Sequence, residues 1–371
     1  MQKKWKRRML LGAMIAGAAG IGGYAFCRSA KFGALPEGEE LERLVRSPHC
    51  VDGVFQNELP TPLMVEDGNI AGTWLNFLFR NEERLRPSRP LPTVKEKLGH
   101  TDRMQDMVVW LGHSSFYLHL GGKRILIDPV LSEYASPVPF AIRAFPGTNP
   151  YLPEDIPDID VLVISHDHWD HMDYPTLAAL EPRISQVVCG LGTGAHLARF
   201  GFSREKIREG DWGDSFSFDE LRVDLTPGRH FSGRLFRRNR TLWAGVVLQS
   251  GKRRVFFSGD SGYGPHFAEI GRSRGPMDLV LLDMGQYNDR WKYVHMVPEE
   301  AARAADELKA AALIPTHVGK FCISHHAWDD PFLRIEKASQ GKSWRLLTPC
   351  IGQPVVAGMA VQYRRWWAAM Q

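Results

Sequence analysis

The sequence predicts a layered α/β sandwich, and three observations carry that prediction. Short apolar runs of strand length recur through the middle of the chain, helical stretches separate several of them, and the composition is that of an ordinary globular protein. The 371 residues are 44% hydrophobic and 24% charged. This composition excludes a disordered chain, a collagen-like fibre and a multi-span membrane protein, and the length allows one large domain or two smaller ones.

The strand signals begin near residue 107. Residues 108–111 and 115–120 are typical of short strands, and Gly121-Gly122 forms a tight turn into residues 123–127, which indicates a hairpin. Further apolar runs of strand length lie at residues 161–164, 187–188, 222–225, 242–248, 255–257, 279–282 and 313–314. The clearest helix is expected at residues 298–312, because Pro298 suits a first helical position and the two glutamates that follow suit the positive end of a helix.

The first 26 residues have the charge pattern of an export signal. Five basic residues and no acid lie in residues 1–8, and the apolar run at residues 9–26 carries no charge. This is the layout of a secretory signal or a signal anchor, and the run is just long enough to span a bilayer. We predict an uncleaved anchor in a bacterial inner membrane, with the N-terminus in the cytoplasm and the rest of the chain in the periplasm. Cleavage after Ala25 and a cytoplasmic placement are the alternatives.

The basic character of the chain comes from this segment. The whole sequence has 46 Lys and Arg against 42 Asp and Glu, a formal charge of +4. Without the five basic residues of the N-terminus, 41 basic residues face 42 acidic ones. A nearly neutral body has no broad positive surface for a polyanion, so no nucleic-acid partner is expected. The five cysteines include no CxxC pair and leave the compartment undecided.

A dense group of potential metal ligands follows the run at residues 161–164. The segment reads His166-Asp-His168-Trp-Asp170-His171. Imidazoles and carboxylates this close together on a loop can converge on a cation such as Zn²⁺. One His-x-His would be compatible with a plain solvated loop, but three histidines interleaved with two aspartates favour a metal site.

Three more candidate ligands occur in the same context. His230, Asp260 and His317 each lie just beyond the end of a predicted strand. One rim of a sheet could therefore collect all of them. Any one alone is more often an ordinary loop residue, but the repeated context argues for a shared site.

The His-x-His-x-Asp-His segment resembles the signature of the metallo-β-lactamase fold superfamily, and the three later residues match its remaining ligand motifs in order. The chain is most similar to a narrower branch, the N-acyl-phosphatidylethanolamine-hydrolysing phospholipase D group, from about residue 31 to 350. The segments that carry this resemblance are Trp110-Leu-Gly-His-Ser, Leu126-Ile-Asp-Pro-Val-Leu-Ser, Ala135-Ser-Pro-Val, Phe257-Ser-Gly-Asp-Ser-Gly-Tyr, His295-Met-Val-Pro-Glu-Glu-Ala, Pro315-Thr-His-Val-Gly-Lys-Phe and His326-Ala-Trp-Asp-Asp-Pro.

The resemblance implies a four-layer αββα sandwich and a dizinc centre. It would place one zinc on His166, His168 and His230 and the other on Asp170, His171 and His317, with Asp260 bridging the two. Iron or manganese are alternatives, because the metal is inferred from ligand type. Asp170 would also orient the attacking hydroxide.

The implied reaction is phospholipase D-type hydrolysis of N-acyl-phosphatidylethanolamine-like lipids. A second reading keeps the hydrolase and changes the substrate to a lactone, a β-lactam or another phosphodiester. A third reading is a non-catalytic envelope protein that has kept the fold. The oligomeric state is not predicted.

Three residues outside the ligand set are also candidates. Asp128 resembles the superfamily's acid that orients a metal-bound histidine, although a plain strand-end carboxylate explains it equally well. His113 is expected beside the ligands, although a lone histidine is by default a packing residue. His295 could contact the phosphate or protonate the leaving alkoxide, and capping of the helix at Pro298 is the alternative.

Five arginines lie between residues 229 and 240, around His230. Guanidinium groups suit phosphate, so Arg234, Arg237 and Arg238 are predicted substrate contacts, with a solvated basic loop as the alternative. The expected organisation is a basic tip and anchor at 1–27, a linker and cap at 28–105, the hydrolase domain at 106–350 and a C-terminal tail at 351–371.

Overall fold

Two seven-stranded sheets form the centre of the computed structural model, which describes residues 20–64, 84–234, 237–359 and 361–370. The first sheet has the order β16 (Pro354–Val356), β3 (Met107–Gly112), β4 (Ser115–Leu120), β5 (Lys123–Ile127), β6 (Ile159–Ile164), β7 (Ile184–Gly190) and β8 (Ile207–Gly210). The second has the order β9 (Ser215–Phe218), β10 (Leu221–Thr226), β11 (Gly245–Ser250), β12 (Arg253–Phe257), β13 (Leu279–Asp283), β14 (Ala312–Thr316) and β15 (Arg345–Leu346).

Both sheets follow the same succession of pairings. In each, four strands pair antiparallel and three more then join in parallel. The carboxyl ends of parallel strands lie at one edge of a sheet, so the loops that follow β5, β6, β12, β13 and β14 come together there. This edge positions the candidate metal ligands.

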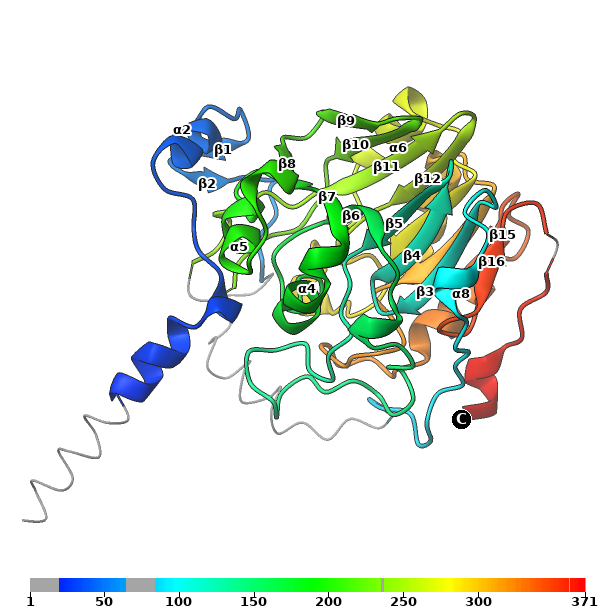
Figure 1. Ribbon diagram of the computed structural model, residues 1–371. Coiled ribbons are helices and arrows are strands. Elements are labelled where there is room, and N and C mark those ends of the chain that lie inside the picture. The colour runs from blue at the N-terminus through cyan, green and yellow to red at the C-terminus, as the bar shows by residue number, and fades with distance from the viewer. Residues whose placement is uncertain (1–19, 65–83, 235–236, 360, 371) are drawn as a thin grey trace, which may run out of the picture.

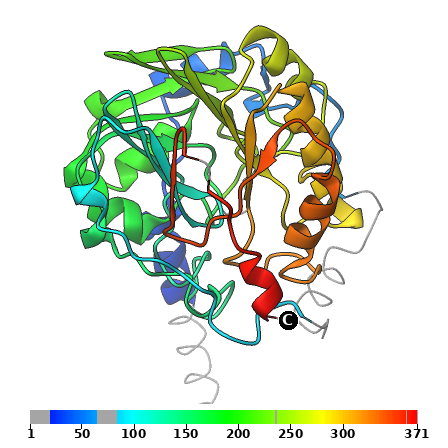
Figure 2. The same cartoon turned by 90° about the vertical axis from the view of Figure 1, so that its right-hand side faces the viewer.

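Helices cover the outer face of each sheet, and the two inner faces pack together, which gives four layers (Figures 1 and 2). The longer helices are α2 (Glu39–Val45), α4 (Tyr174–Leu180), α5 (Thr193–Arg199), α6 (His266–Ser273), α7 (Pro298–Glu307) and α8 (Asp330–Ala338). Short 3-10 turns are η1 (Ala30–Phe32), η2 (Leu98–His100), η3 (Pro153–Asp155), η4 (Glu181–Arg183), η5 (Arg204–Lys206), η6 (Asp289–Trp291) and η7 (Trp366–Met370), and β1 (Cys50–Val51) pairs with β2 (Val54–Phe55).

The core between the sheets is apolar and aromatic. Phe116 of β4 meets Phe257 of β12 with ring centroids 6.2 Å apart, and both side chains are fully buried. The strands β3, β4 and β13 are buried along their whole length because both of their faces are covered. This is why they appear in the sequence as continuous apolar runs.

The predicted sandwich is confirmed, with differences at its ends. The helix expected at residues 298–312 stops at Glu307, because Lys309 has φ +54° and residues from Ala312 onward form β14. The run at residues 242–248 becomes a strand only from Gly245. In the region assigned to a tail, Pro354–Val356 pairs with β3 and extends the first sheet.

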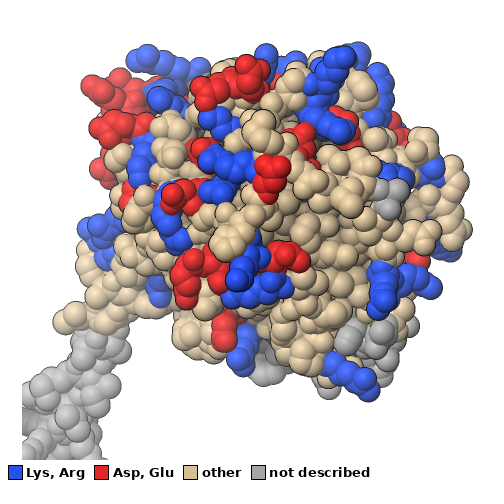
Figure 3. Space-filling view, turned by 45° about the vertical axis from the view of Figure 1, so that its right-hand side comes forward, with Lys and Arg blue, Asp and Glu red and all other residues tan. Residues whose placement is uncertain are grey.

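The predicted membrane segment lies largely outside the described residues. Residues 20–27 are helical and project from the body (Figure 1). Among the residues that the structure describes, none of the helices has the length and apolar character needed to cross a bilayer. On the face that Figure 3 presents, basic and acidic side chains are interspersed.

Candidate metal centre

The candidate ligands meet at the edge where the parallel strands end. The loop after β6 carries four of them, and the segments after β10, β12 and β14 carry one each. Within the described parts of the chain, three groups of histidine and aspartate have potential ligand atoms within 4.8 Å of one another. These groups are His166, His168, His230 and Asp260; His113, Asp170, His171 and His317; and Asp260, Asp283, His295 and His317.

The first group consists of two buried imidazoles, His166 and His230, and the half-buried imidazole of His168, which face one buried carboxylate. Nδ1 of His168 is 2.9 Å from Nε2 of His166 and 3.3 Å from Nε2 of His230. Burial and the nearby histidines hold the pKa values of His166 and His230 well below their usual range. Both rings are therefore neutral near pH 7, which is the form that binds a metal ion.

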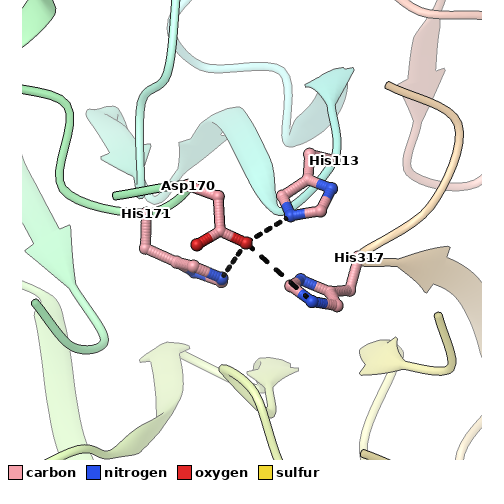
Figure 4. Close-up of side chains that lie close together, drawn as sticks. All are labelled: His113, Asp170, His171 and His317. Carbon is pink, nitrogen blue, oxygen red and sulfur yellow. Dashed lines mark hydrogen bonds and ion pairs between the residues drawn. The ribbon is translucent and has the colours of Figure 1, made fainter. Parts of the chain in front are cut away.

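The second group surrounds the carboxylate of Asp170 (Figure 4). Its Oδ2 is 2.9 Å from Nε2 of His113, 3.7 Å from Nε2 of His171 and 3.9 Å from Nε2 of His317. His113 comes from the β3–β4 turn, where it has φ +54°. The structure thus brings His113 into contact with Asp170, one of the candidate ligands.

Asp260 lies between the two groups. Its Oδ2 is 3.7 Å from Nε2 of His166 and 3.6 Å from Nε2 of His230. Its Oδ1 is 3.1 Å from Nε2 of His171 and 3.1 Å from Nδ1 of His317. One carboxylate therefore presents an oxygen to each group, the arrangement that a bridging ligand requires.

The donor atoms fit metal ions. Nε2 of His171 and Oδ1 of Asp260 are buried and, although they lie 3.1 Å apart, form no well-aligned hydrogen bond with each other or with another described residue. Leaving such atoms unsatisfied is costly. Burial alone would lower the pKa of His171, but the carboxylates of Asp260 and Asp170 hold it well above its usual range. The site thus favours positive charge, and its imidazole and carboxylate donors suit zinc, iron or manganese.

Asp128 is placed to orient a candidate ligand. Its Oδ2 accepts a hydrogen bond from Nδ1 of His171 at 2.8 Å, and its Oδ1 accepts from the backbone N–H of Ser165 at 2.8 Å. This fixes the His171 ring with Nε2 turned toward Asp260. Of the two interpretations that the sequence left open, the geometry favours the orienting acid.

Asp283 is a buried acid that the sequence reasoning missed. Its Oδ2 lies 2.8 Å from Nδ1 of His295, and the His295 ring stacks on His317 at 4.8 Å between centroids and 13° between planes. Burial raises the pKa of Asp283 to about 6, and although burial lowers the pKa of His295, Asp283 raises it above its usual value. The available signal was an acid directly after the apolar run at residues 279–282.

His295 does not cap the helix at Pro298. The backbone N–H of Val297, which precedes the helix, donates to the side chain of Glu300. The side chain of His295 instead faces the ligand groups.

Arg234 has a different role from the predicted one. It is only 4% exposed, and its guanidinium donates to the backbone carbonyls of Asp167, Met172 and Lys31 at 2.7–2.8 Å. It also lies 3.9 Å from the ring centroid of Trp169. Arg234 thus supports the ligand loop from within the protein, because all of these partners are protein groups.

Arg237 and Arg238, the other two predicted substrate contacts, are exposed. Asp167, the one acid of the loop outside the candidate ligand set, accepts from the backbone N–H of Gly233 at 2.6 Å and from Oγ1 of Thr241 at 3.0 Å. These two hydrogen bonds hold the ligand loop against the segment that carries His230.

Comparisons with known proteins agree with this geometry. A family model described as "Beta-lactamase superfamily domain" matches residues 123–318. The chain is 36% identical to the uncharacterized protein Rv0906 of Mycobacterium tuberculosis, over 87% of this chain and 88% of that protein. It is 33% identical to N-acyl-phosphatidylethanolamine-hydrolyzing phospholipase D 1 of Caenorhabditis elegans, over 57% of this chain and 63% of that protein.

A solved structure supports the fold alone. It is that of Igni18, a metallo hydrolase from the archaeon Ignicoccus hospitalis, which aligns with a TM-score of 0.54 at 20% identity, over 69% of this chain and 100% of that one.

Proposed function

Because the chain belongs to the metallo-β-lactamase superfamily, in the branch of the N-acyl-phosphatidylethanolamine-hydrolysing phospholipases D, and is therefore a metal-dependent hydrolase, we propose that it is a dizinc phosphodiesterase of phospholipase D type. One observation carries the proposal: Asp260 presents one carboxylate oxygen to each of two groups of potential ligands. Two ions in that arrangement would lower the pKa of a water molecule and neutralise charge on the phosphoryl oxygens. Iron or manganese are the other metals that the same donors suit.

The ligands of this proposal are the seven residues named from the sequence. His166, His168 and His230 would hold one ion, and Asp170, His171 and His317 the other. His113 completes the second group by holding the carboxylate of Asp170 in place. Asp170 also accepts a hydrogen bond from the attacking water and so orients it.

The proton that the leaving group needs would come from His295. Its Nδ1 is held by the carboxylate of Asp283 at 2.8 Å, which leaves Nε2 as the atom that can donate. The carboxylate favours the protonated ring, since it raises the pKa of His295. His295 is thereby oriented as a general acid for an alkoxide.

The proposed substrates are N-acyl-phosphatidylethanolamine-like lipids. The name of the Caenorhabditis elegans relative supports this choice. Water would attack phosphorus, the bond from phosphorus to the ethanolamine oxygen would break, and phosphatidic acid and an N-acylethanolamine would leave. We further propose that residues 1–27 anchor the protein in a membrane, with the two-sheet sandwich, which includes β16, as the exported hydrolase domain.

The test combines metal analysis with a substrate panel. Purified protein is loaded with zinc, its metal content is measured, and N-acyl-phosphatidylethanolamine in neutral detergent micelles is assayed for release of phosphatidic acid. A lactone, a β-lactam and bis(p-nitrophenyl) phosphate complete the panel. We expect two metal ions per chain and formation of phosphatidic acid. Intact lipid in the presence of protein that carries two zinc ions would contradict the substrate assignment, and activity on another panel member would reassign it.

A further inference from the structure

A cleft of about 480 Å³ opens beside the candidate metal centre. Its walls come from the segment around η6, from the turn before α8 and from α8 itself. His295 lines it, and a ring nitrogen of His295 lies within 4.8 Å of ligand atoms of Asp260 and His317. The cleft therefore reaches the metal centre through the residue proposed to protonate the leaving alcohol.

The cations that line the cleft fall into two kinds. Arg334 is already committed, since its guanidinium pairs with Glu299 at 2.6 Å and with Asp330 at 3.6 Å. Arg290 and Lys292 have no carboxylate within 4.0 Å in the described part of the chain, although the exposed Asp289 also lines the cleft. Two side chains thus bring positive charge to the cleft without an ion-pair partner, and they outnumber Asp289, the one carboxylate among its described lining residues.

The chain around these two cations is held in place. The side-chain oxygen of Asn288 accepts from the backbone N–H of Arg290 at 3.0 Å, and Nε1 of Trp291 donates to the carbonyl of Gln286 at 2.9 Å. Behind them, the rings of Tyr287 and His326 stack at 4.3 Å. A cleft with a fixed aromatic wall and two cations that lack an ion-pair partner has the features of an anion-binding site.

We propose that this cleft binds a carboxylate or phosphate group carried by the leaving alcohol of the substrate. The inference rests on the proposed phosphodiesterase function and deepens it. His295 marks the side on which the alcohol leaves, so a substituent of that alcohol extends toward Arg290 and Lys292. The preferred headgroup is then anionic: an N-acylated serine, which differs from N-acylated ethanolamine by one carboxylate, fits this description.

The reaction is the same hydrolysis with a different alcohol. Water adds to phosphorus, the bond from phosphorus to the serine oxygen breaks, and that oxygen takes up a proton. The products are phosphatidic acid and an N-acylserine. No oxidant, reductant or further reactant is needed.

The experiment compares two lipids that differ only in the carboxylate. N-acyl-phosphatidylserine and N-acyl-phosphatidylethanolamine with the same acyl chains are assayed at low mole fraction in neutral detergent micelles. We expect the wild-type protein to have a kcat/KM about tenfold higher for the serine lipid, as one charge-assisted contact provides. The double variant Arg290→Gln/Lys292→Gln should lose this preference, with little change on the ethanolamine lipid.

A matched control removes two positive charges elsewhere. Lys252 and Arg272 are exposed and do not line the cleft, so Lys252→Gln/Arg272→Gln should keep the wild-type preference. Equal kcat/KM values for the two lipids in the wild type would overturn the proposal. So would a preference that survives in the cleft variant, or that falls equally in both double variants.

A binding measurement separates this inference from the proposed function. If the wild-type protein hydrolyses neither lipid, the phosphodiesterase assignment fails, and the cleft is tested by saturation-transfer NMR with N-acetylserine and N-acetylethanolamine. Binding of N-acetylserine that is lost in the cleft variant and kept in the control supports the anionic site. Absence of binding, or equal binding by all three proteins, contradicts it.

Discussion

The two halves of the sandwich contribute to the candidate metal centre in different ways. The first sheet supplies four potential ligands from one loop, His166 to His171, while the second supplies His230, Asp260 and His317 from the ends of three strands. The four ligands on one loop stay close together because they are adjacent in the sequence. The three ligands that follow different strands come together only when the second sheet has formed. Metal binding should therefore report the folding of the second half more than that of the first.

The largest expected effect comes from Asp260, where the two halves meet. Asp260→Asn should lower the metal content from two ions to one or fewer, because a neutral amide has only one oxygen and cannot present one to each group. Phosphodiesterase activity should fall by more than about 1000-fold, since metal ions contribute several kcal/mol to the transition state. Elemental analysis and kinetics check both. Two bound ions with full turnover would overturn the bridging assignment.

A smaller effect on turnover is expected at Asp283, in the second half. Asp283→Asn removes the carboxylate that orients the His295 ring and raises its pKa. The kcat for substrates with alkyl leaving groups should therefore fall by about 100-fold. A p-nitrophenyl diester needs no proton donor, so its rate should change little. The exposed Asp219→Asn serves as the control. A loss of equal size with both kinds of leaving group would mean that Asp283 supports structure and not proton transfer.

The next prediction concerns Asp128, which follows β5 in the first sheet. Asp128→Asn weakens the hydrogen bond that orients His171, and such changes cost about 10- to 100-fold in metal affinity or activity. Competition with a coloured chelator measures the affinity. The effect should concern one ion only, because Asp128 contacts one candidate ligand of the second group. Equal weakening of both ions would show that the damage spreads through the fold.

The smallest effect concerns stability and pH in the second half. Burial, helped by Arg229, lowers the pKa of His266 to about 4, whereas an unfolded chain has a histidine pKa of about 6.5. The unfolded state therefore takes up the proton first as the pH falls. The stabilisation from the neutral ring is complete above pH ~6.5 and is lost toward pH ~4, roughly 1–3 kcal/mol in total.

Urea unfolding of metal-free protein at pH 7.5 and pH 4.5 checks this expectation. His266→Gln should lose less stability than the wild type between these two pH values. The exposed His100→Gln should behave like the wild type. Identical losses in all three proteins would exclude His266 as a source of the pH dependence.

The same contrast between local and dispersed features explains what the sequence could predict. The His166–His171 loop was recognisable because its ligands are adjacent, and the strands were recognisable because coverage on both faces makes them continuous apolar runs. Asp283 was missed because one acid after an apolar run has no partner nearby in the sequence, and His295 is brought to it only by the fold.

Side-chain direction was the other limit. Arg234 lies in a basic segment that suggests phosphate binding, yet its guanidinium turns inward to three backbone carbonyls. Composition does not determine which way a side chain points. The pairing of β16 with β3 could not be predicted either, because Pro354–Val356 is only three residues long and begins with a proline, which weakens a strand pattern.

The contact between Arg234 and the carbonyl of Lys31 ties the ligand loop to the chain that leads from the N-terminus. Nζ of Lys31 also donates to the carbonyl of Pro137, and Phe32 packs against Trp169 at 5.2 Å between ring centroids. Only a few residues separate residue 27 from Lys31 and Phe32, which make these contacts. If residues 1–27 lie in a bilayer, the candidate metal centre stays close to that bilayer. The enzyme would then act on lipids of the membrane that anchors it and not on lipids of separate vesicles.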